Sequence, residues 1–139
     1  MATIERHMAR DMVTLPPAAT CAEAAVLMRE RKIGSVAVID GDEVVGLVAE
    51  RDLALRLVAD GAPPSTTVGE IVNRAGPSVG PKASEKQCAD MMHKHHCRHL
   101  LVKDGDRVIG LISMRDVMVL MLDEKEHVIQ QLEGYISGH

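Results

Sequence analysis

Residues 38–52 read Val-Ile-Asp-Gly-Asp-Glu-Val-Val-Gly-Leu-Val-Ala-Glu-Arg-Asp, and residues 102–116 read Val-Lys-Asp-Gly-Asp-Arg-Val-Ile-Gly-Leu-Ile-Ser-Met-Arg-Asp. Nine of these fifteen positions carry the same residue in both stretches, which chance does not produce. The same offset of 64 residues aligns residues 3–60 with residues 67–124 without a gap. Self-similarity at a fixed offset is the sign of a repeat architecture, so the chain is a duplicated unit.

Each unit opens with a short predicted strand and a helix. The stretches around Leu15 and Val79 read as strands that a nearby proline stops, because proline cannot donate a hydrogen bond to a sheet. The helix that follows begins at a residue pair with capping-box spacing, in which each side chain can bond to the other's free backbone N–H. The two pairs are Thr20 with Glu23 and Ser84 with Gln87.

A hairpin and a second helix complete each unit. Asp-Gly-Asp separates two apolar runs at 40–42 and again at 104–106, which is typical of a tight turn between antiparallel strands. The second helix is expected to start near Glu50 in the first unit and near Met114 in the second. The hairpin strands are expected at 35–39, 44–48, 99–102 and 108–112.

These elements predict an α+β fold of two β-α-β-β-α repeats. A unit of about 60 residues buries too little apolar surface alone, so we expect the repeats to pack sheet to sheet as one module. The expected division is repeat 1 over 1–64, repeat 2 over 65–124, and a C-terminal helix and tail over 125–139. The tail has apolar residues at helical spacing and no partner inside either repeat, so it covers either a dimer surface or its own chain.

Composition excludes several classes of function. The chain has 139 residues, 46% of them hydrophobic, which suffices for a packed core. A net charge of −4 and a single Tyr, with no Trp or Phe, argue against nucleic-acid binding. Cys21, Cys88 and Cys97 have no zinc-like spacing and are expected to be small apolar core residues. No signal peptide or apolar span of about 18 residues is evident, so we expect a cytoplasmic protein that does not enter a membrane.

The stretches 46–52 and 110–116 each consist of Gly, two apolar residues, Ala in the first copy or Ser in the second, two further residues and Asp. They resemble the signature of the CBS domain, and the region 3–124 resembles a CBS-domain pair, also called a Bateman module. Residues 124–136 resemble the terminal helix of small stand-alone bacterial CBS-pair signal-transduction proteins. The resemblance implies a regulatory module that binds an adenine nucleotide, AMP foremost and ATP or NAD(H) as alternatives. It also implies association as a homodimer.

Asp52 and Asp116 suit a nucleotide because an ionised carboxylate can accept hydrogen bonds from both neighbouring hydroxyls of a ribose. Both lie in the first turn of a predicted helix, where free N–H groups and the positive end of the helix dipole favour a phosphate. Ser113 can add a hydroxyl contact, and Arg51 or Arg115 can neutralise phosphate charge. The alternative is that the segment from Ser113 to Asp116 merely caps a helix.

The resemblance implies two clefts, each built from the Asp-bearing segment of one repeat and the first two strands of the other. Ala49 lacks a hydroxyl for the ribose in the second cleft, whereas Arg98 and His99 match family positions that often face phosphate. The better cleft is expected to contain Ile112, Ser113, Arg115, Asp116, Val13, Ile33 and Gly34. The second cleft is expected to contain Val48, Ala49, Arg51, Asp52, Pro77, Cys97, Arg98 and His99.

Residues 93–99, His-Lys-His-His-Cys-Arg-His, invite a metal interpretation because imidazole and thiolate bind zinc and copper. Only His93 and His96 share a predicted helical face; His95 points elsewhere and His99 is expected to begin a strand. We therefore expect no metal site. The cluster is interpreted as a polar helix end beside a phosphate-binding cleft, or, for His99, as a phosphate contact.

The leading hypothesis is a non-enzymatic sensor of cellular energy or redox state, with no catalytic residues and no cofactor acting as a catalyst. Its expected partners are a small-molecule nucleotide, a second copy of the chain and an unidentified regulated protein. The alternatives are a structural or interaction subunit with vestigial clefts, or a module for an S-adenosylmethionine-type ligand. An enzyme using Cys97 is disfavoured because the sequence has no P-loop, nucleophile elbow or CxxC motif.

Overall fold

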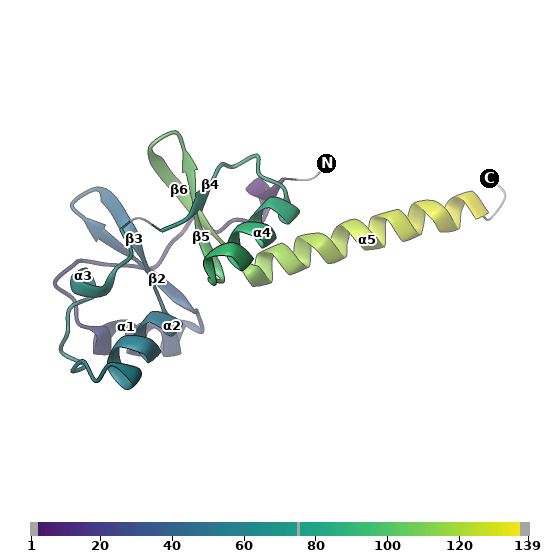
Figure 1. Cartoon of the computed structure of the whole chain (residues 1–139). Coiled ribbons are helices and arrows are strands. Elements are labelled where there is room, and N and C mark those ends of the chain that lie inside the picture. Colours follow the sequence, from purple (N-terminus) through teal and green to yellow (C-terminus); the bar gives the residue numbers. More distant parts are fainter. Residues whose placement is uncertain (1–2, 75, 137–139) are drawn as a thin grey trace. The chain divides into compact units, whose positions relative to one another are not determined.

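The computed structural model describes residues 3–74 and 76–136, which form two compact units (Figure 1). One unit lies within residues 11–76, and the other combines the N-terminal segment up to Arg10 with the chain from Pro77 onward. Both contain the predicted order of strand, helix, hairpin and helix. The α+β class and the repeated β-α-β-β-α arrangement are therefore confirmed.

The unit of residues 11–76 has a three-stranded sheet in the order β1-β2-β3. β1 runs parallel to β2, and β2 runs antiparallel to β3. Its elements are β1 Thr14–Leu15, α1 Cys21–Arg31, β2 Ser35–Asp40, β3 Glu43–Ala49, α2 Glu50–Leu53, the π-helix η2 Ala54–Ala59 and α3 Val68–Ile71.

The other unit repeats this pattern with a sheet in the order β4-β5-β6. β4 runs parallel to β5, and β5 runs antiparallel to β6. Its elements are the 3-10 helix η1 Ile4–Arg6, β4 Ser78–Val79, α4 Glu85–His95, β5 His99–Asp104, β6 Arg107–Ser113 and α5 Met114–Ile136.

Each hairpin turns at the Asp-Gly-Asp stretch predicted for it. Gly41 and Gly105 both have φ of +63°, the left-handed region that glycine enters at least cost. The strands extend one or two residues beyond the apolar runs, and the register of each hairpin shifts once, after Val38 and after Val102. The duplication thus extends to the irregularities of the sheets.

The helix starts follow the predicted capping pairs, one of them only in part. At α4 the Ser84 hydroxyl accepts from the Gln87 N–H at 3.2 Å, and the Gln87 side chain accepts from the Ser84 N–H at 2.8 Å. At α1 the Thr20 hydroxyl accepts from the Glu23 N–H at 3.1 Å, but the return bond is not among the contacts of the described residues. Thr20 also forms an antiparallel bridge with Thr67, in which the neighbouring N–H groups of Cys21 and Val68 donate the hydrogen bonds.

The segment before the first strand of each repeat packs against a strand of the other repeat. Ala9 and Leu111 of β6 exchange two backbone hydrogen bonds of 2.8 and 2.9 Å. Asn73, which lies 64 residues after Ala9, forms the equivalent antiparallel bridge with Leu47 of β3. The sequence ranges of the repeats and the spatial units therefore differ by an exchange of these leading segments.

Glycine is required beside each of these bridges. A Cβ atom on Gly110 would lie 2.7 Å from the carbonyl oxygen of Ala9, which is closer than real contacts allow. A Cβ atom on Gly46 would collide with the carbonyl group of Asn73 in the same way. The identity of these two glycines therefore follows from close backbone approach.

Each unit has its own apolar core. Ile4 of the N-terminal segment is fully buried in the core of the second unit, and Val68 has the equivalent place in the unit of residues 11–76. Cys21 and Cys88 are fully buried as well, which confirms that they serve as small apolar core residues. Cys97 is half-buried and packs against the core that contains Cys88.

The second helices of the two repeats differ in length. α2 has four residues and continues as η2 to Ala59; Gly61, with φ of +74°, and two prolines at 63 and 64 then stop it. The second repeat has no glycine or proline between Met114 and Gly134, so α5 runs unbroken from Met114 to Ile136. The tail helix expected from residue 125 is therefore the second half of α5.

The described helices also expose apolar side chains. Leu55 and Val58 lie on η2 and are exposed outside the core. Val117 and Leu120, near the start of α5, are buried, but the rest of its apolar side chains are not. Of the helices that the structure describes, none is both long and apolar enough to span a membrane.

Candidate functional site

Asp116 lies in the first turn of α5 and is held by the residue that precedes the helix. Its Oδ2 accepts hydrogen bonds from the Ser113 backbone N–H at 2.9 Å and from the Ser113 hydroxyl at 2.8 Å. The same hydroxyl accepts from the Asp116 N–H at 3.1 Å. This arrangement is a complete capping box with Asp in the acidic position, so the cap considered for these residues is present.

Asp52 occupies the equivalent position at the start of α2. Its Oδ2 accepts from the Ala49 backbone N–H at 2.7 Å, and Ala49 has no hydroxyl to add a second bond. Within the described part of the chain, the other carboxylate oxygen of each Asp, Oδ1, has no hydrogen-bond donor from the protein. Each carboxylate is thus oriented through one oxygen and keeps a second oxygen to accept from a ligand.

The predicted site residues of the first repeat meet at one edge of its sheet. The Gly34 carbonyl accepts from the Glu50 N–H at 2.9 Å, which joins the start of β2 to the start of α2. The Val13 carbonyl accepts from the Ala37 N–H at 2.9 Å, which brings the start of β1 to the same edge. The site residues on this edge are Val13, Ile33, Gly34, Val48, Ala49, Arg51 and Asp52.

The second repeat brings its predicted residues together in the same way. The Arg98 carbonyl accepts from the Met114 N–H at 2.8 Å, and His99 pairs with Ser113 across the β5–β6 ladder. Each edge therefore contains the Asp-bearing part of one expected cleft and the strand part of the other. The site residues on this edge are Pro77, Cys97, Arg98, His99, Ile112, Ser113, Arg115 and Asp116.

Side chains at the two edges differ in what they can offer a ligand. Val48 and Ile112 are fully buried in the cores, so only their backbone atoms are available. Arg51, Arg98 and Arg115 are exposed. The edges therefore combine carboxylates with guanidinium groups, which suits a ligand that has both hydroxyl and phosphate groups.

The histidine cluster lies at the end of α4 and does not form a common face. His93 and His95 are in the last turn, His96 ends the helix with φ of +53°, and His99 begins β5. The prediction that His93 and His96 share a helical face is wrong, because His96 has left the helix in a left-handed conformation. Among the described residues, no group of three or more His, Cys, Asp or Glu side chains is arranged to hold a metal ion.

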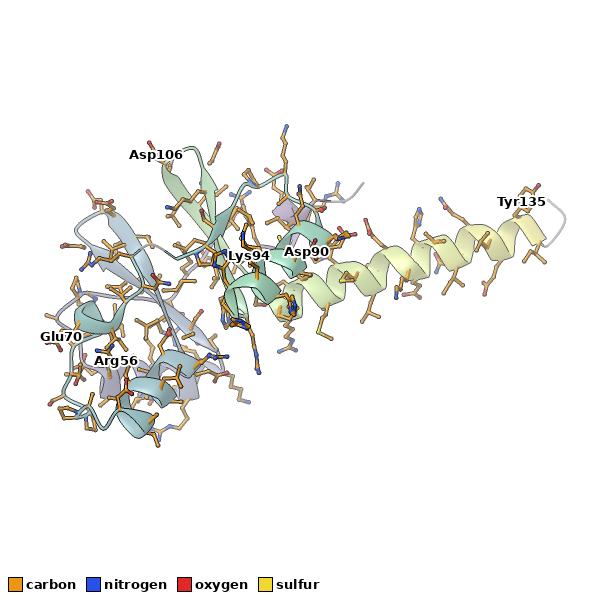
Figure 2. All side chains as sticks on the ribbon, in the orientation of Figure 1. Arg56, Glu70, Asp90, Lys94, Asp106 and Tyr135 are labelled. Atoms are coloured by element: carbon orange, nitrogen blue, oxygen red, sulfur yellow. The ribbon has the colours of Figure 1, made fainter. Side chains whose placement is uncertain are left out.

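Two of the three thiols are unsuited to nucleophilic chemistry. Burial raises the pKa of Cys88 to about 11, and the charge of Glu85 adds to the shift. Burial also raises the pKa of Cys21, with Glu70 adding to the shift and Arg56 opposing it; Figure 2 labels both charged residues. Since the thiolate is the reactive form, Cys21 and Cys88 are not suited to act as nucleophiles; the enzyme hypothesis concerned Cys97, to which these shifts do not apply.

A carboxyl pair that sequence patterns do not reveal joins α4 to α5. A hydrogen bond to Glu124 raises the pKa of Glu85, and burial adds to the shift. Two carboxyl groups can share a hydrogen bond only if one of them is protonated. The His7 Nε2 atom also lies 3.7 Å from Asp123 Oδ2, so both pairs connect the middle of α5 to other elements of its own unit.

An open groove of about 510 Å³ lies beside β4 and α4 in the same unit. Asp90 and Lys94, which Figure 2 labels, belong to its lining. None of the predicted site residues lines it, so the groove is separate from the Asp116 edge. The lining consists of Val79, Gly80, Ala83, Gln87, Asp90, Met91 and Lys94.

The two repeats can be assigned to a family from these features. The sequence model of the CBS domain matches the chain twice, over residues 3–59 and 68–123. The chain belongs to the CBS-domain family. The two matched regions coincide with the two repeats and cover most of the chain, which confirms the resemblance to a CBS-domain pair.

Relatives of similar size support the assignment. CBS domain-containing protein YhcV of Bacillus subtilis is 29% identical over 119 residues, which are 86% of this chain and 85% of that protein. A solved structure of a protein with CBS domains from Burkholderia ambifaria matches with a TM-score of 0.82 and 32% identity, covering 88% of this chain and 95% of that one. The chain is therefore a CBS-domain regulatory module.

A third similar protein has been solved with a metal. Hypoxic response protein 1 of Mycobacterium tuberculosis is 30% identical over 100 residues, 70% of each chain. A crystal structure of Hypoxic Response Protein I has two coordinated zinc ions and matches with a TM-score of 0.70 and 27% identity, covering 85% of this chain and 98% of that one. The zinc is a property of that structure and is not transferred to this CBS pair.

Proposed function

We propose that this CBS pair binds an adenine nucleotide, with AMP the first candidate and ATP or NAD(H) the alternatives, and acts as a sensor of cellular energy or redox state. The observation that carries the proposal is the pair of carboxylates on Asp52 and Asp116. Each is fixed through Oδ2 by the residue before its helix and has Oδ1 left to accept hydrogen bonds. Binding of this kind needs no catalytic step.

Asp116 is the better ribose acceptor of the two. Its Oδ2 is held by the N–H and the hydroxyl of Ser113, whereas Asp52 is held only by the N–H of Ala49. A carboxylate that is already ordered loses less conformational freedom when a ligand binds. Ser113 therefore contributes by holding Asp116, because its single hydroxyl proton is already donated to that carboxylate.

Charge at the same edge favours the phosphate. Arg115 is exposed beside Asp116, and Arg98 is exposed on the same edge of the β4–β6 sheet. Guanidinium groups bind phosphate oxygens through paired hydrogen bonds. A nucleoside monophosphate therefore matches both the carboxylate and the guanidinium groups present there.

Isothermal titration of the full chain with AMP, ATP and NADH tests the proposal. At least one of the three should show saturable binding. Asp116→Asn should lower its affinity by about ten-fold or more, because a charged hydrogen-bond acceptor is worth roughly 1.5–3 kcal/mol. The asparagine oxygen can still accept from the Ser113 N–H, so the cap should largely survive. Absence of binding for all three ligands would refute the sensor.

The capping box at α4 is a matched control, because it has the same geometry without predicted site residues. Gln87→Ala removes the return bond to the Ser84 N–H and should reduce stability by about 1 kcal/mol or less without changing affinity. If Asp116→Asn behaves like Gln87→Ala, losing stability but no affinity, Asp116 is a cap alone. That result would favour a structural or interaction subunit.

We propose that the module associates as a homodimer and acts on an unidentified regulated protein. We also place it in the cytoplasm, because Cys21 and Cys88 are both free thiols and free thiols fit a reducing compartment.

A further inference from the structure

The second half of α5 is a helix without cover from the described part of its own unit. Every residue from 125 to 136 is exposed, and Figure 1 shows this half extending away from α4 and the β4–β6 sheet. A helical segment this short is marginal in water unless an amphipathic face is packed against something. Gly134 weakens it further, because glycine is a poor helix former. The segment therefore needs a partner surface.

The exposed apolar residues of α5 follow a heptad. Six positions that begin at Met118 are spaced by 4, 3, 4, 3 and 4 residues. This spacing places their side chains along one line of the helix, the seam by which one helix packs along another. Ile129 is 53% exposed and Ile136 is 80% exposed, so the seam is open at its far end. We call the positions Met118, Leu122, Lys125, Ile129, Leu132 and Ile136 the α5 seam.

Apart from Lys125, apolar and polar side chains lie on different faces of the exposed half of this helix. Met121, Val128 and Tyr135 widen the α5 seam on one side, and Tyr135 is 82% exposed. Figure 2 labels Tyr135 near the end of α5. His127 and Gln131 lie on the opposite face and are 3.1 Å apart through their Nε2 atoms. The helix is therefore amphipathic over its whole free length, as expected for a two-helix pair.

We infer that the α5 seam packs against the same seam of a second copy, with the two helices antiparallel and centred near Ile129. The seam contains one charge, Lys125, which a parallel pair would set against its own symmetry mate. In the antiparallel pair, Lys125 is level with Glu133 of the partner subunit, so the charges are complementary. A two-fold pair of this kind is closed and uses one surface on both copies.

A lipid surface is the less suitable occupant. Helices that lie on membranes present Lys and Arg on the polar face to anionic headgroups. The exposed half of α5 instead has Glu126 and Glu133 outside the seam and no Lys or Arg there, and the whole chain has a net charge of −4. The inference specifies the surface of the homodimer proposed above and does not depend on nucleotide binding, so either can fail alone.

Sedimentation of the full chain over a range of concentrations tests the inference. The wild type should dimerise, and Ile129→Glu should weaken the dimer by about a hundred-fold or more, because it buries an unpaired charge in the seam. Gln130→Glu adds the same charge one residue away on the polar face and should leave the dimer within about two-fold of the wild type. Unchanged circular dichroism confirms that both variants are folded.

The charge pair tests the orientation. Lys125→Glu and Glu133→Lys should each weaken the dimer, and the double variant should recover most of the loss only if the helices are antiparallel. Tyr135, the only Tyr in a chain without Trp, reports burial directly through quenching of its fluorescence by acrylamide. Quenching should fall as the dimer forms.

Four results would overturn the inference. The first is a wild type that stays monomeric at all concentrations with Tyr135 protected, which would mean that the helix packs on its own chain. The second is a dimer that Ile129→Glu leaves intact, and the third is a double charge variant whose dimer does not recover. The fourth is binding of α5 to phosphatidylserine vesicles that Ile129→Glu abolishes, while no dimer forms.

Discussion

Replacing Ile4 by Ala should destabilise the second unit, although Ile4 belongs to the first repeat in sequence. Ile4 is fully buried in the core that contains Cys88, Leu100 and Ile112. The change removes three side-chain carbons, about 2.4 kcal/mol at ~0.8 kcal/mol for each, and a partly collapsed cavity brings the loss to about 3 kcal/mol. That loss is a large part of the roughly 5–15 kcal/mol that stabilises an ordinary domain.

Urea unfolding measures the loss, and hydrogen exchange shows where it occurs. Exchange should accelerate in β5 and β6 more than in β2 and β3, because the N-terminal segment belongs to the unit of the second repeat. Glu5→Ala, an exposed change in the same segment, is the control and should stay within about 0.5 kcal/mol of the wild type. A loss below about 1 kcal/mol for Ile4→Ala, or faster exchange mainly in β2 and β3, would refute the exchange of leading segments.

Three further predictions follow from local structure. His96→Gly should stabilise the protein by about 1 kcal/mol in thermal unfolding, because glycine adopts φ of +53° without the cost that His96 bears; a lower melting temperature would contradict this. Cys97 should react with a thiol reagent near neutral pH well before Cys88, whose pKa is raised to about 11; equal rates in the folded protein would count against the burial described. The folded-state pKa of Glu85 is raised, so its pair with Glu124 stabilises the protein below the ordinary glutamate pKa and loses that stabilisation as pH rises through the folded-state pKa. Glu85→Gln should therefore raise the melting temperature at pH 7 but not at low pH. A gain of the same size at both pH values would argue against a shared proton.

Much of the fold could be predicted because the relevant signals are local. The offset of 64 residues identified the duplication, and Asp-Gly-Asp identified both hairpin turns. The capping pair of Ser84 and Gln87 formed as its spacing predicts, since a capping box involves residues only three positions apart. Patterns that act within one turn are readable without tertiary structure.

The features that could not be predicted depend on contacts distant in sequence. Thr20 forms an antiparallel bridge with Thr67, 47 residues away, which its capping-box spacing does not reveal. The pairing of Ala9 with Leu111 has no periodicity that would reveal it, although a glycine stands beside the bridge at the same place in both repeats, Gly46 and Gly110. For the candidate site, spacing placed Asp52 and Asp116 correctly at helix starts. Spacing did not show that the Ser113 hydroxyl donates its hydrogen bond to Asp116.

The exchange of leading segments changes what counts as the smallest piece able to fold. A fragment cut at the repeat boundary near residue 64 would keep Ile4 without its core and would lose Val68 from its own. A chain with only one repeat would have a leading segment without a core to pack in and a core without a leading segment. Two identical chains of this kind would complete each other by exchanging their leading segments. Joining two copies end to end makes that exchange intramolecular, so that assembly no longer depends on concentration.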